Sequence, residues 1–309
     1  MPEWLWERGI GEARAALVED DRIVEATIEL DDGLRVGAIL SARRTAVDRV
    51  ALADGGELQL VSPPPGVPQG ATLTVEIVRE AIPEAGRAKL PRCAPTDADP
   101  RAAPDLHDRI AATGHPIREL RAHEPDALEA AGWSELLDEA TSGEIVFASG
   151  ALRMSPTPAM TLFDVDGAAP LDALAIAAAR AVAQAIRRHG IGGSIGIDFP
   201  TLAGKAARQA VAAAIDAQLP APFERTAMNG FGFLQIVRPR PRASIPELLR
   251  SDPVAAAARA ALRTLERTPP GSPRTLRVVP PVLAYLTARP TWLAELARRT
   301  GVALRLESA

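Results

Sequence analysis

Short runs rich in apolar residues, separated by turn residues, dominate the first third of the chain. Residues 15–18 and 23–30 are two such runs around the acidic turn 19–21, and this pattern predicts a β-hairpin. Gly and Pro clusters then separate four further runs, at residues 35–40, 45–52, 57–61 and 72–78. Several short strands with turn residues between them are typical of a small β-barrel.

The second half of the chain changes to strands that alternate with helices. The pattern predicts strands at residues 144–148, 159–166, 194–199 and 231–237, with helices at 170–189 and 201–218 between them. Thr201 is the expected N-cap of the second helix. Strands that alternate with helices favour a mainly parallel sheet.

The remaining stretches carry weaker signals. Residues 91–117 are rich in proline among Asp, Ala and Arg, which predicts a linker or domain junction. A helical period runs from about residue 125 to 140. Near the C-terminus the pattern predicts helices at 253–266 and 290–300, and strands at 275–279 and 302–306.

Composition limits the class of protein. The chain has 309 residues, which suggests about two domains, and 47% of them are hydrophobic, which excludes general disorder. Cys93 is the single cysteine, so the chain cannot form an internal disulfide or a cysteine-based zinc site. Charged residues interrupt every apolar stretch well before the roughly 20 residues that a membrane span needs. We therefore expect a cytoplasmic protein with no membrane partner and no secretory leader.

The strongest chemical signal lies between residues 160 and 199. Asp164 and Asp198 each come near the C-terminal end of a predicted strand, and a helix connects the two strands. If the strands share a sheet, the crossover makes them parallel, and adjacent strands lie ~4.8 Å apart. The two carboxylates would then meet at the edge where such sheets bind ligands. Asp166 follows Asp164 by two residues and is expected on the same face.

Carboxylates this close repel one another, and a hard divalent cation relieves that repulsion. Mg²⁺ prefers one or two carboxylates together with water and substrate phosphate. The cluster therefore favours metal-activated water that attacks a phosphodiester. A plainer interpretation is that these aspartates only cap helices or close turns, which Asp does readily. The residues alone leave both interpretations open.

The order of motifs around the aspartates resembles the ribonuclease E/G family. The segments FDVDG, GIGGSIGIDF and GFGFLQIVRPR are similar to the family's catalytic subdomain, and GEARAALVEDDRIVEATIEL is similar to its opening strands. TSGEIVFASG, TLRVVPPVLAYL and GVALRLE extend the resemblance over most of the chain except its middle. The resemblance implies an α+β fold, in which a small N-terminal OB-like β-barrel is set into an α/β catalytic domain. That domain would be RNase H-like and deoxyribonuclease-I-like, with a partly parallel sheet.

The resemblance also divides the chain into five parts. They are opening strands of the catalytic region at 1–34, an RNA-binding barrel at 35–90, a linker and reduced middle region at 91–130, a metal-binding catalytic subdomain at 131–250, and a small C-terminal α/β unit at 251–309.

Members of this family cleave single-stranded RNA internally, with Mg²⁺ held by two aspartates. The resemblance places the metal ligands at Asp164 and Asp198, which would also be the catalytic residues. Asp166 stands where the family has an assisting Asn, so it joins the expected catalytic set. We therefore expect an endoribonuclease, a metal-dependent phosphodiester hydrolase that takes part in RNA processing.

The expected contacts to RNA phosphate come from basic residues. Arg238, Arg240 and Arg242 match or follow the basic end of the family's Phe-Gly strand, and arginine suits phosphate recognition. Lys89 near the barrel exit is a fourth candidate. The bare sequence would equally allow a solvated basic tail before a Pro-rich loop.

Departures from the family support a second hypothesis. The Cys-Pro-x-Cys motif is missing, so we expect no zinc and no zinc-linked dimer. Residues 35–78 contain no Phe, Tyr or Trp, although base stacking contributes ~1–3 kcal/mol per base in such barrels. The net charge of −4 does not by itself indicate a nucleic-acid binder. The alternative is a catalytically weak or inactive RNA-binding or adaptor protein derived from the family; a nuclease for DNA or short oligonucleotides is a third possibility.

Overall fold

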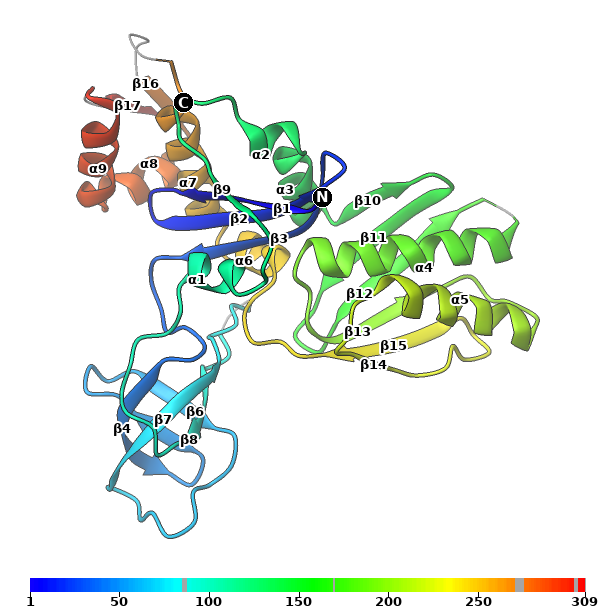
Figure 1. Cartoon of the computed structure of the whole chain (residues 1–309), viewed down its shortest axis with the longest axis horizontal. Helices are drawn as coiled ribbons and strands as arrows, with labels where there is room; N and C mark the ends of the chain where they lie inside the picture. Colours follow the sequence, from blue (N-terminus) through cyan, green and yellow to red (C-terminus); the bar gives the residue numbers. More distant parts are fainter. Residues whose placement is uncertain (85–87, 169, 270–274, 303–304, 309) are drawn as a thin grey trace. The chain divides into compact units, whose positions relative to one another are not determined.

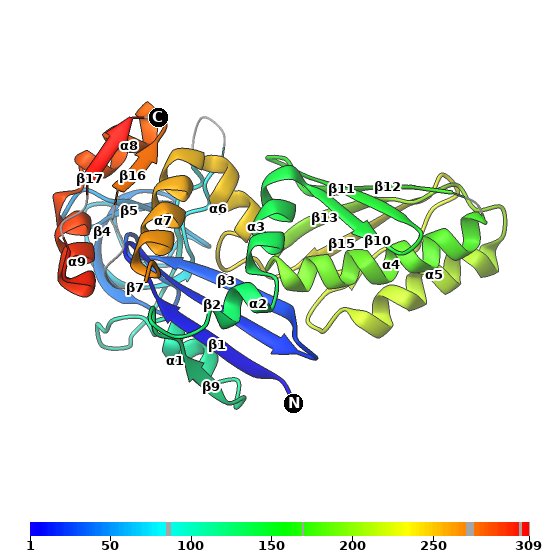
Figure 2. The ribbon, with the colours of Figure 1, turned by 90° about the horizontal axis from the view of Figure 1, so that it is seen from above.

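The computed structural model describes residues 1–84, 88–168, 170–269, 275–302 and 305–308 (Figures 1 and 2). These residues form two compact units, and each unit combines segments that are distant in the sequence. Unit 1 comprises Met1–Asp32, Leu106–Ser134 and Leu248–Ala309, and unit 2 comprises Gly33–Asp105 and Glu135–Glu247. Each unit therefore gathers its sheets from separate stretches of sequence.

Unit 1 is built on a four-stranded sheet with the order β3-β2-β1-β9. β2 (Glu12–Glu19) and β3 (Arg22–Leu30) pair antiparallel, which confirms the predicted hairpin. Asp20 and Asp21 form its turn with φ of 49° and 60°, a region that Asp tolerates better than most residues. The pattern missed two strands, β1 (Glu3–Arg8) and β9 (Ile117–Glu119).

Helices and a small sheet complete unit 1. α7 begins after Asp252, whose side chain accepts a hydrogen bond from Ala255 N at 2.9 Å. The apolar sides of α7 and its neighbours pack together around Leu262 and Leu296. The elements are α1 (Leu106–Ala111), α2 (Ala127–Ala130), α7 (Pro253–Glu266), α8 (Pro280–Thr287), α9 (Pro290–Thr300), β16 (Thr275–Val278) and β17 (Arg305–Ser308). Residues 303–304 of the predicted last strand lie outside the described residues.

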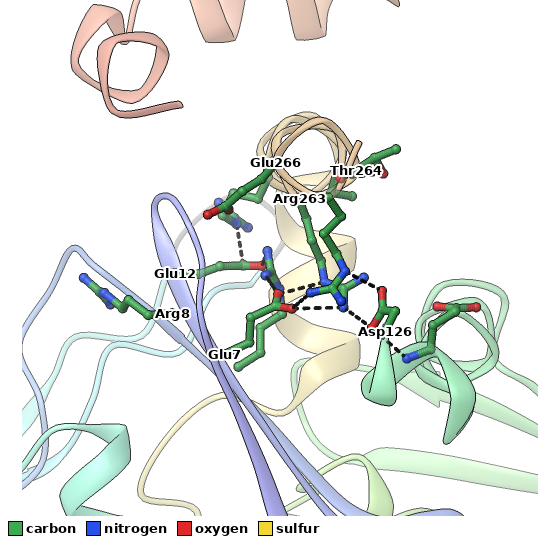
Figure 3. A network of polar contacts seen from close by, with 12 residues as sticks. Glu7, Arg8, Glu12, Asp126, Arg263, Thr264 and Glu266 are labelled. Atoms are coloured by element: carbon green, nitrogen blue, oxygen red, sulfur yellow. Dashed lines mark hydrogen bonds and ion pairs between the residues drawn. The ribbon is translucent and has the colours of Figure 1, made fainter. Parts of the chain in front are cut away.

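A buried ionic network joins the sheet of unit 1 to α7 (Figure 3). Glu7 on β1 accepts hydrogen bonds from Arg14 Nη1 at 2.5 Å, Arg263 Nε at 2.8 Å and Arg267 Nη1 at 3.0 Å. Glu12 accepts from Arg259 Nε at 2.8 Å. The side chains of Glu7 and Arg14 are 9% and 2% exposed, so the pairs are largely shielded from water. Their charges are tolerated because each has a partner of opposite sign.

Asp126, the N-cap of α2, belongs to the same network. Burial alone would raise the pKa of Asp126, but hydrogen bonds from Arg263 and from Glu129 N hold that pKa below its ordinary value. A carboxyl group with a lowered pKa stabilises the folded state at a pH above its unfolded pKa. This contribution is lost as the pH falls through the folded pKa.

The small barrel that the sequence predicts is present in unit 2, as a closed five-stranded barrel with the order β4-β5-β6-β8-β7. Val50, Leu58, Val75 and Ile77 are fully buried in its core. Its strands are β4 (Ile39–Ala46), β5 (Arg49–Ala51), β6 (Glu57–Leu60), β7 (Thr72–Arg79) and β8 (Arg92–Pro95).

The strand β8 corrects the prediction of a linker throughout residues 91–117. It pairs with both β6 and β7 and so closes the barrel. Cys93 on β8 is fully buried, and burial raises the pKa of its thiol to about 11. A neutral, enclosed thiol acts as a small apolar core residue, which explains a cysteine at this position.

A six-stranded sheet forms the other part of unit 2, with the order β10-β11-β12-β13-β15-β14. Among the described strands of this sheet, only β12 and β13 pair in parallel, so the prediction of a mainly parallel sheet is wrong, although the α+β class holds. The sequence pattern missed β11, which returns antiparallel in a hairpin after β10. The strands are β10 (Glu144–Phe147), β11 (Gly150–Pro156), β12 (Thr161–Gly167), β13 (Gly193–Asp198), β14 (Glu224–Arg225) and β15 (Phe233–Arg238).

Two helices, α4 (Leu171–Arg188) and α5 (Lys205–Gln218), cover one face of this sheet (Figures 1 and 2). Their buried residues pack against Phe163, Ile195 and Ile197 of the strands. α5 begins later than predicted: Gly204 is its N-cap, and Thr201 Oγ1 donates instead to Phe231 O at 3.3 Å. No covering helix is described on the opposite sheet face, which we call the open face.

Two shorter helices, α3 (Trp133–Ser142) and α6 (Ile245–Ser251), complete the described elements. Gly132, with φ of 94°, separates α3 from α2, so the single helix predicted at about 125–140 is in fact two. Within the residues placed by the structure, no helix combines the length and apolar character needed to cross a membrane.

Glu7→Gln is expected to destabilise the protein by about 3–5 kcal/mol, because it leaves the buried arginines without a charged partner. Asp31→Asn is the control. Asp31 lies 2.8 Å from Arg8 Nη1, but the two side chains are 33% and 47% exposed. The control should cost less than about 1 kcal/mol. Urea unfolding followed by circular dichroism measures both changes, and equal losses would contradict the structural role of the network.

Candidate functional site

The pairing of β12 with β13 places Asp164 directly opposite Asp198. The two residues are Cα partners in the parallel ladder, and neighbouring strands lie ~4.8 Å apart. Alternate residues of a strand share one face, and the preceding residues Phe163 and Ile197 are buried against the helices. Both aspartates therefore project from the open face, where both are exposed. The structure brings together the two carboxylates that the sequence analysis expected to be neighbours.

Neither aspartate is neutralised within the described part of the protein. No hydrogen bond or ion pair joins the side chain of Asp164 or Asp198 to another described residue, whereas the buried carboxylates of Glu7 and Glu12 in unit 1 are paired with arginine. Two ionised carboxylates on adjacent strands destabilise each other. The arrangement suits a ligand that brings positive charge from outside the protein.

Asp166 does not join the pair. It lies two residues beyond Asp164, which corresponds to roughly 6.6 Å along a strand. Its carboxylate faces Arg153 instead, with Oδ2 3.5 Å from Nη2. Among the residues that the structure describes, no group of three or more His, Cys, Asp or Glu side chains could hold a metal ion. The geometry therefore supports a metal site with two protein carboxylates, and the assisting catalytic role of Asp166 stays a prediction.

Arg153 is a residue that the sequence analysis missed. It is the cross-strand partner of Asp164 on β11, and Phe233 is the partner of Asp198 on β15. These four residues form a line across the open face that we call the acid row: Arg153, Asp164, Asp198 and Phe233. The side chain of Arg153 is 58% exposed. The apolar residues Leu152 and Met154 on either side of Arg153 were the sequence signal that could have predicted a strand here with Arg153 on its exposed face.

The apolar side of the acid row depends on Gly196. A Cβ at this position would lie 2.7 Å from Phe233 Cζ and 2.8 Å from Leu162 Cδ2. Because glycine has no side chain, Phe233 and Leu162 can approach each other over the middle of the sheet. The carboxylate pair is thus bordered by Arg153 on one side and by apolar groups on the other.

The three predicted RNA-binding arginines lie away from the carboxylates. Arg238 is the backbone strand partner of Gly193, which lies at the opposite end of β13. Gly193 is five residues from Asp198, which corresponds to roughly 16 Å along the strand. Arg240 pairs with Glu247. Arg242 Nε is 3.8 Å from Glu80 Oε1. These residues are not placed to contact a group bound at the aspartates.

Lys89 is also engaged with neighbouring groups. Its Nζ lies 2.5 Å from Glu84 Oε1 and donates a hydrogen bond to Pro158 O at 2.9 Å. Any contact of Lys89 with RNA phosphate would compete with these two interactions.

Two arginines of the barrel, Arg79 and Arg92, lie close to the predicted RNA-binding residue Arg240 and add to the positive charge around it. Burial, together with the positive charges of Arg92 and Arg240, lowers the pKa of Arg79. The Nε atoms of Arg79, Arg92 and Arg240 are buried and make no hydrogen bond among the described residues. The sequence analysis missed Arg79 and Arg92 because they lie on barrel strands, far along the chain from the basic end of β15.

Comparison with models of known protein families finds no match to this chain, and comparison with curated proteins finds none.

Mg²⁺ is expected to raise the melting temperature of the protein, because a ligand held by the folded state stabilises it by ~2.7 kcal/mol at 100 times its Kd. Asp198→Asn should abolish this response and should not lower stability in EDTA, since it removes a like-charge repulsion. Asp166→Asn is the matched control, because it makes the same charge change at a position outside the pair. Thermal unfolding with Mg²⁺ and with EDTA provides the test. An unchanged Mg²⁺ response in Asp198→Asn would eliminate this metal site.

Proposed function

We propose that this protein is a Mg²⁺-dependent endoribonuclease that cleaves single-stranded RNA, with Asp164 and Asp198 as the metal ligands. The observation that carries the proposal is the pair of exposed carboxylates in register on adjacent strands, without a cationic partner among the described residues. The motif order that resembles the ribonuclease E/G family supports the same chemistry. The closed barrel and the mixed sheet are compatible with the OB-like and RNase H-like parts that this resemblance implies.

The donor atoms of the pair fit Mg²⁺. Two carboxylates provide hard oxygen ligands, and the exposed position leaves room for the waters and substrate phosphate that complete its coordination. Neither thiolate nor imidazole lies in the acid row, so the set does not favour a softer metal. When bound, Mg²⁺ would supply an activated water at neutral pH and stabilise charge on the phosphate.

The acid row indicates what the protein's own groups would do. Asp164 and Asp198 would bind and orient the reacting phosphate through the ion. Arg153 stands next to Asp164, where its guanidinium group would donate hydrogen bonds to a phosphate oxygen. Because these residues lie on regular strands, their backbone positions are set by the sheet before substrate binds.

The basic group at the other end of the sheet would have a different role. Arg238, Arg240, Arg242 and Lys89 are too far from the acid row to contact the reacting phosphate. We assign them, with Arg79 and Arg92, to phosphates farther along the RNA. Such contacts position a nucleic acid and depend on salt, but they do not read its sequence.

Asp164→Asn and Asp198→Asn should each reduce cleavage of a fluorescent single-stranded RNA by more than about 100-fold. This estimate follows because loss of an outer-shell partner alone typically costs about 10–100-fold in a metal site. Asp166→Asn is the control and should keep most of the activity. Gel analysis with Mg²⁺ and with EDTA, together with circular dichroism of each variant, provides the measurement. Wild-type rates in either of the first two variants would exclude the assignment.

The same assay separates the alternative functions. The position of Asp166, outside the pair and facing Arg153, favours the second candidate, an RNA-binding protein without catalysis. That protein would bind the RNA at every Mg²⁺ concentration and never cleave it. A DNA oligonucleotide of the same sequence distinguishes a ribonuclease from a nuclease with broader specificity.

Arg153→Gln is expected to slow cleavage by about 10- to 100-fold, since a hydrogen bond to a charged group contributes ~1.5–3 kcal/mol. The Mg²⁺ concentration at half-maximal rate should not rise, because the change removes a positive charge near the pair. Arg242→Gln is the comparison. It should weaken RNA binding and reduce its salt dependence while leaving the rate at saturating RNA unchanged. Similar effects of the two changes on the saturated rate would contradict the role of Arg153.

A further inference from the structure

Phe231 is unusual among the aromatic residues of this protein. It is 86% exposed, whereas the other aromatic side chains in the described part of the chain are buried or half-buried. A single exposed apolar residue needs no functional explanation by itself. The hydrogen-bonded backbone around Phe231 and its position two residues before Phe233, the strand partner of Asp198, are the observations that give it one.

Hydrogen bonds fix the backbone of Phe231 on both sides. Asn229 Oδ1 accepts from Phe231 N at 2.9 Å and from Phe233 N at 3.0 Å. Thr201 Oγ1 donates to Phe231 O at 3.3 Å. The ring is therefore presented to solvent from an ordered turn. An ordered turn loses little backbone entropy when a ligand binds.

Gly232 joins this turn to the metal site. Phe199, which directly follows Asp198, donates from its N to Gly232 O at 3.1 Å. Gly232 has φ of 100°, and a Cβ there would lie 2.1 Å from Phe199 O, so only glycine allows this approach. The next residue, Phe233, is the partner of Asp198 in the acid row. The turn that carries Phe231 therefore leads directly into the end of β15 that pairs with Asp198.

We propose that Phe231 stacks on the nucleobase next to the phosphate bound at Asp164 and Asp198, and so selects unpaired nucleotides. This inference rests on the proposed function. An aromatic ring beside a phosphate-binding site matches a nucleotide, whose flat base and charged phosphate are adjacent. Stacking needs an accessible base face, which a single strand offers and a regular duplex conceals.

The barrel provides a second reason. Residues 35–78 contain no Phe, Tyr or Trp, so this part of the barrel cannot provide the aromatic stacking that single-strand binding normally uses. A protein partner would require a broad apolar patch around the ring. The same end of the sheet carries Asp164 and Asp198, which have no cationic partner among the described residues and oppose burial in a dry interface. A nucleobase that stacks on the ring of Phe231 requires much less contact area than a protein partner would.

The test measures binding of a fluorescent single-stranded RNA by anisotropy in Mg²⁺, within a reading time over which a gel shows that the RNA is intact. Phe231→Ala should weaken binding by about 5- to 100-fold, and Phe231→Leu should weaken it similarly because leucine lacks a ring face. Phe231→Trp should retain or improve the affinity. Val146→Ala is the matched control. Val146 is 82% exposed at the other edge of the same sheet face, and its loss should change nothing.

Abasic substitutions made one at a time in the RNA identify the stacked nucleotide. One abasic position should weaken binding to the wild-type protein by the same factor as Phe231→Ala, and should cause no further loss in that variant. Additive losses at every position would overturn the stacking proposal, as would equal effects of Phe231→Ala and Val146→Ala. The absence of RNA binding by the wild-type protein would overturn it as well.

The experiment separates this inference from the proposed nuclease activity. Cleavage that persists while Phe231→Ala binds RNA normally would reject the stacking role and leave the nuclease intact. A loss of binding in Phe231→Ala, with no cleavage by the wild-type protein at any Mg²⁺ concentration, would reject the nuclease and keep the stacking contact.

Discussion

The parallel pairing of β12 with β13 is the constraint on which the candidate site depends. Phe163, Ile195 and Ile197 must face the helices, and a shift of one residue in the register would turn these apolar side chains toward water. The same register leaves Asp164 and Asp198 side by side on the open face. The repulsion between the carboxylates is therefore maintained by the burial of the core behind them. A hydrophobic core can hold charges in an arrangement that they would not adopt alone.

The two faces of this sheet have separate tasks. α4 and α5 bury one face with small and branched residues, and their packing stabilises the strands. The open face has no such covering among the described elements, so its side chains can serve binding. Arg153 and Phe233 extend the acid row over four adjacent strands. Across the sheet, the row therefore changes from a cationic side chain, Arg153, through the two aspartates to an aromatic side chain, Phe233.

Local patterns predicted what local interactions determine. The hairpin of β2 and β3, the helix α4 and the pairing of Asp164 with Asp198 all follow from residue periodicity and short connections. The closure of the barrel by β8 could not be predicted, because a four-residue strand with buried Cys93 depends on partners distant in sequence. The same holds for Arg153, whose importance comes from the strand beside it. The ionic network of Glu7 could not be predicted for the same reason, since Arg263 on α7 and Arg267 at the C-cap of α7 are 256 and 260 residues away from it.

The pairing of charges elsewhere in the protein makes the carboxylate pair stand out. Glu7 and Glu12, both nearly buried, bind arginines, and each of the four predicted basic ligands has a neighbouring acceptor in the chain. A fold stabilised only by such compensation would be expected to place an arginine between Asp164 and Asp198. Arg153 is close enough in the ladder to do so, yet it contacts Glu144 and Asp166. Asp164 and Asp198 therefore keep their negative charge without a cationic partner among the described residues, although Arg153 is nearby. Such a pair of carboxylates is a candidate binding site for a cation from outside the protein.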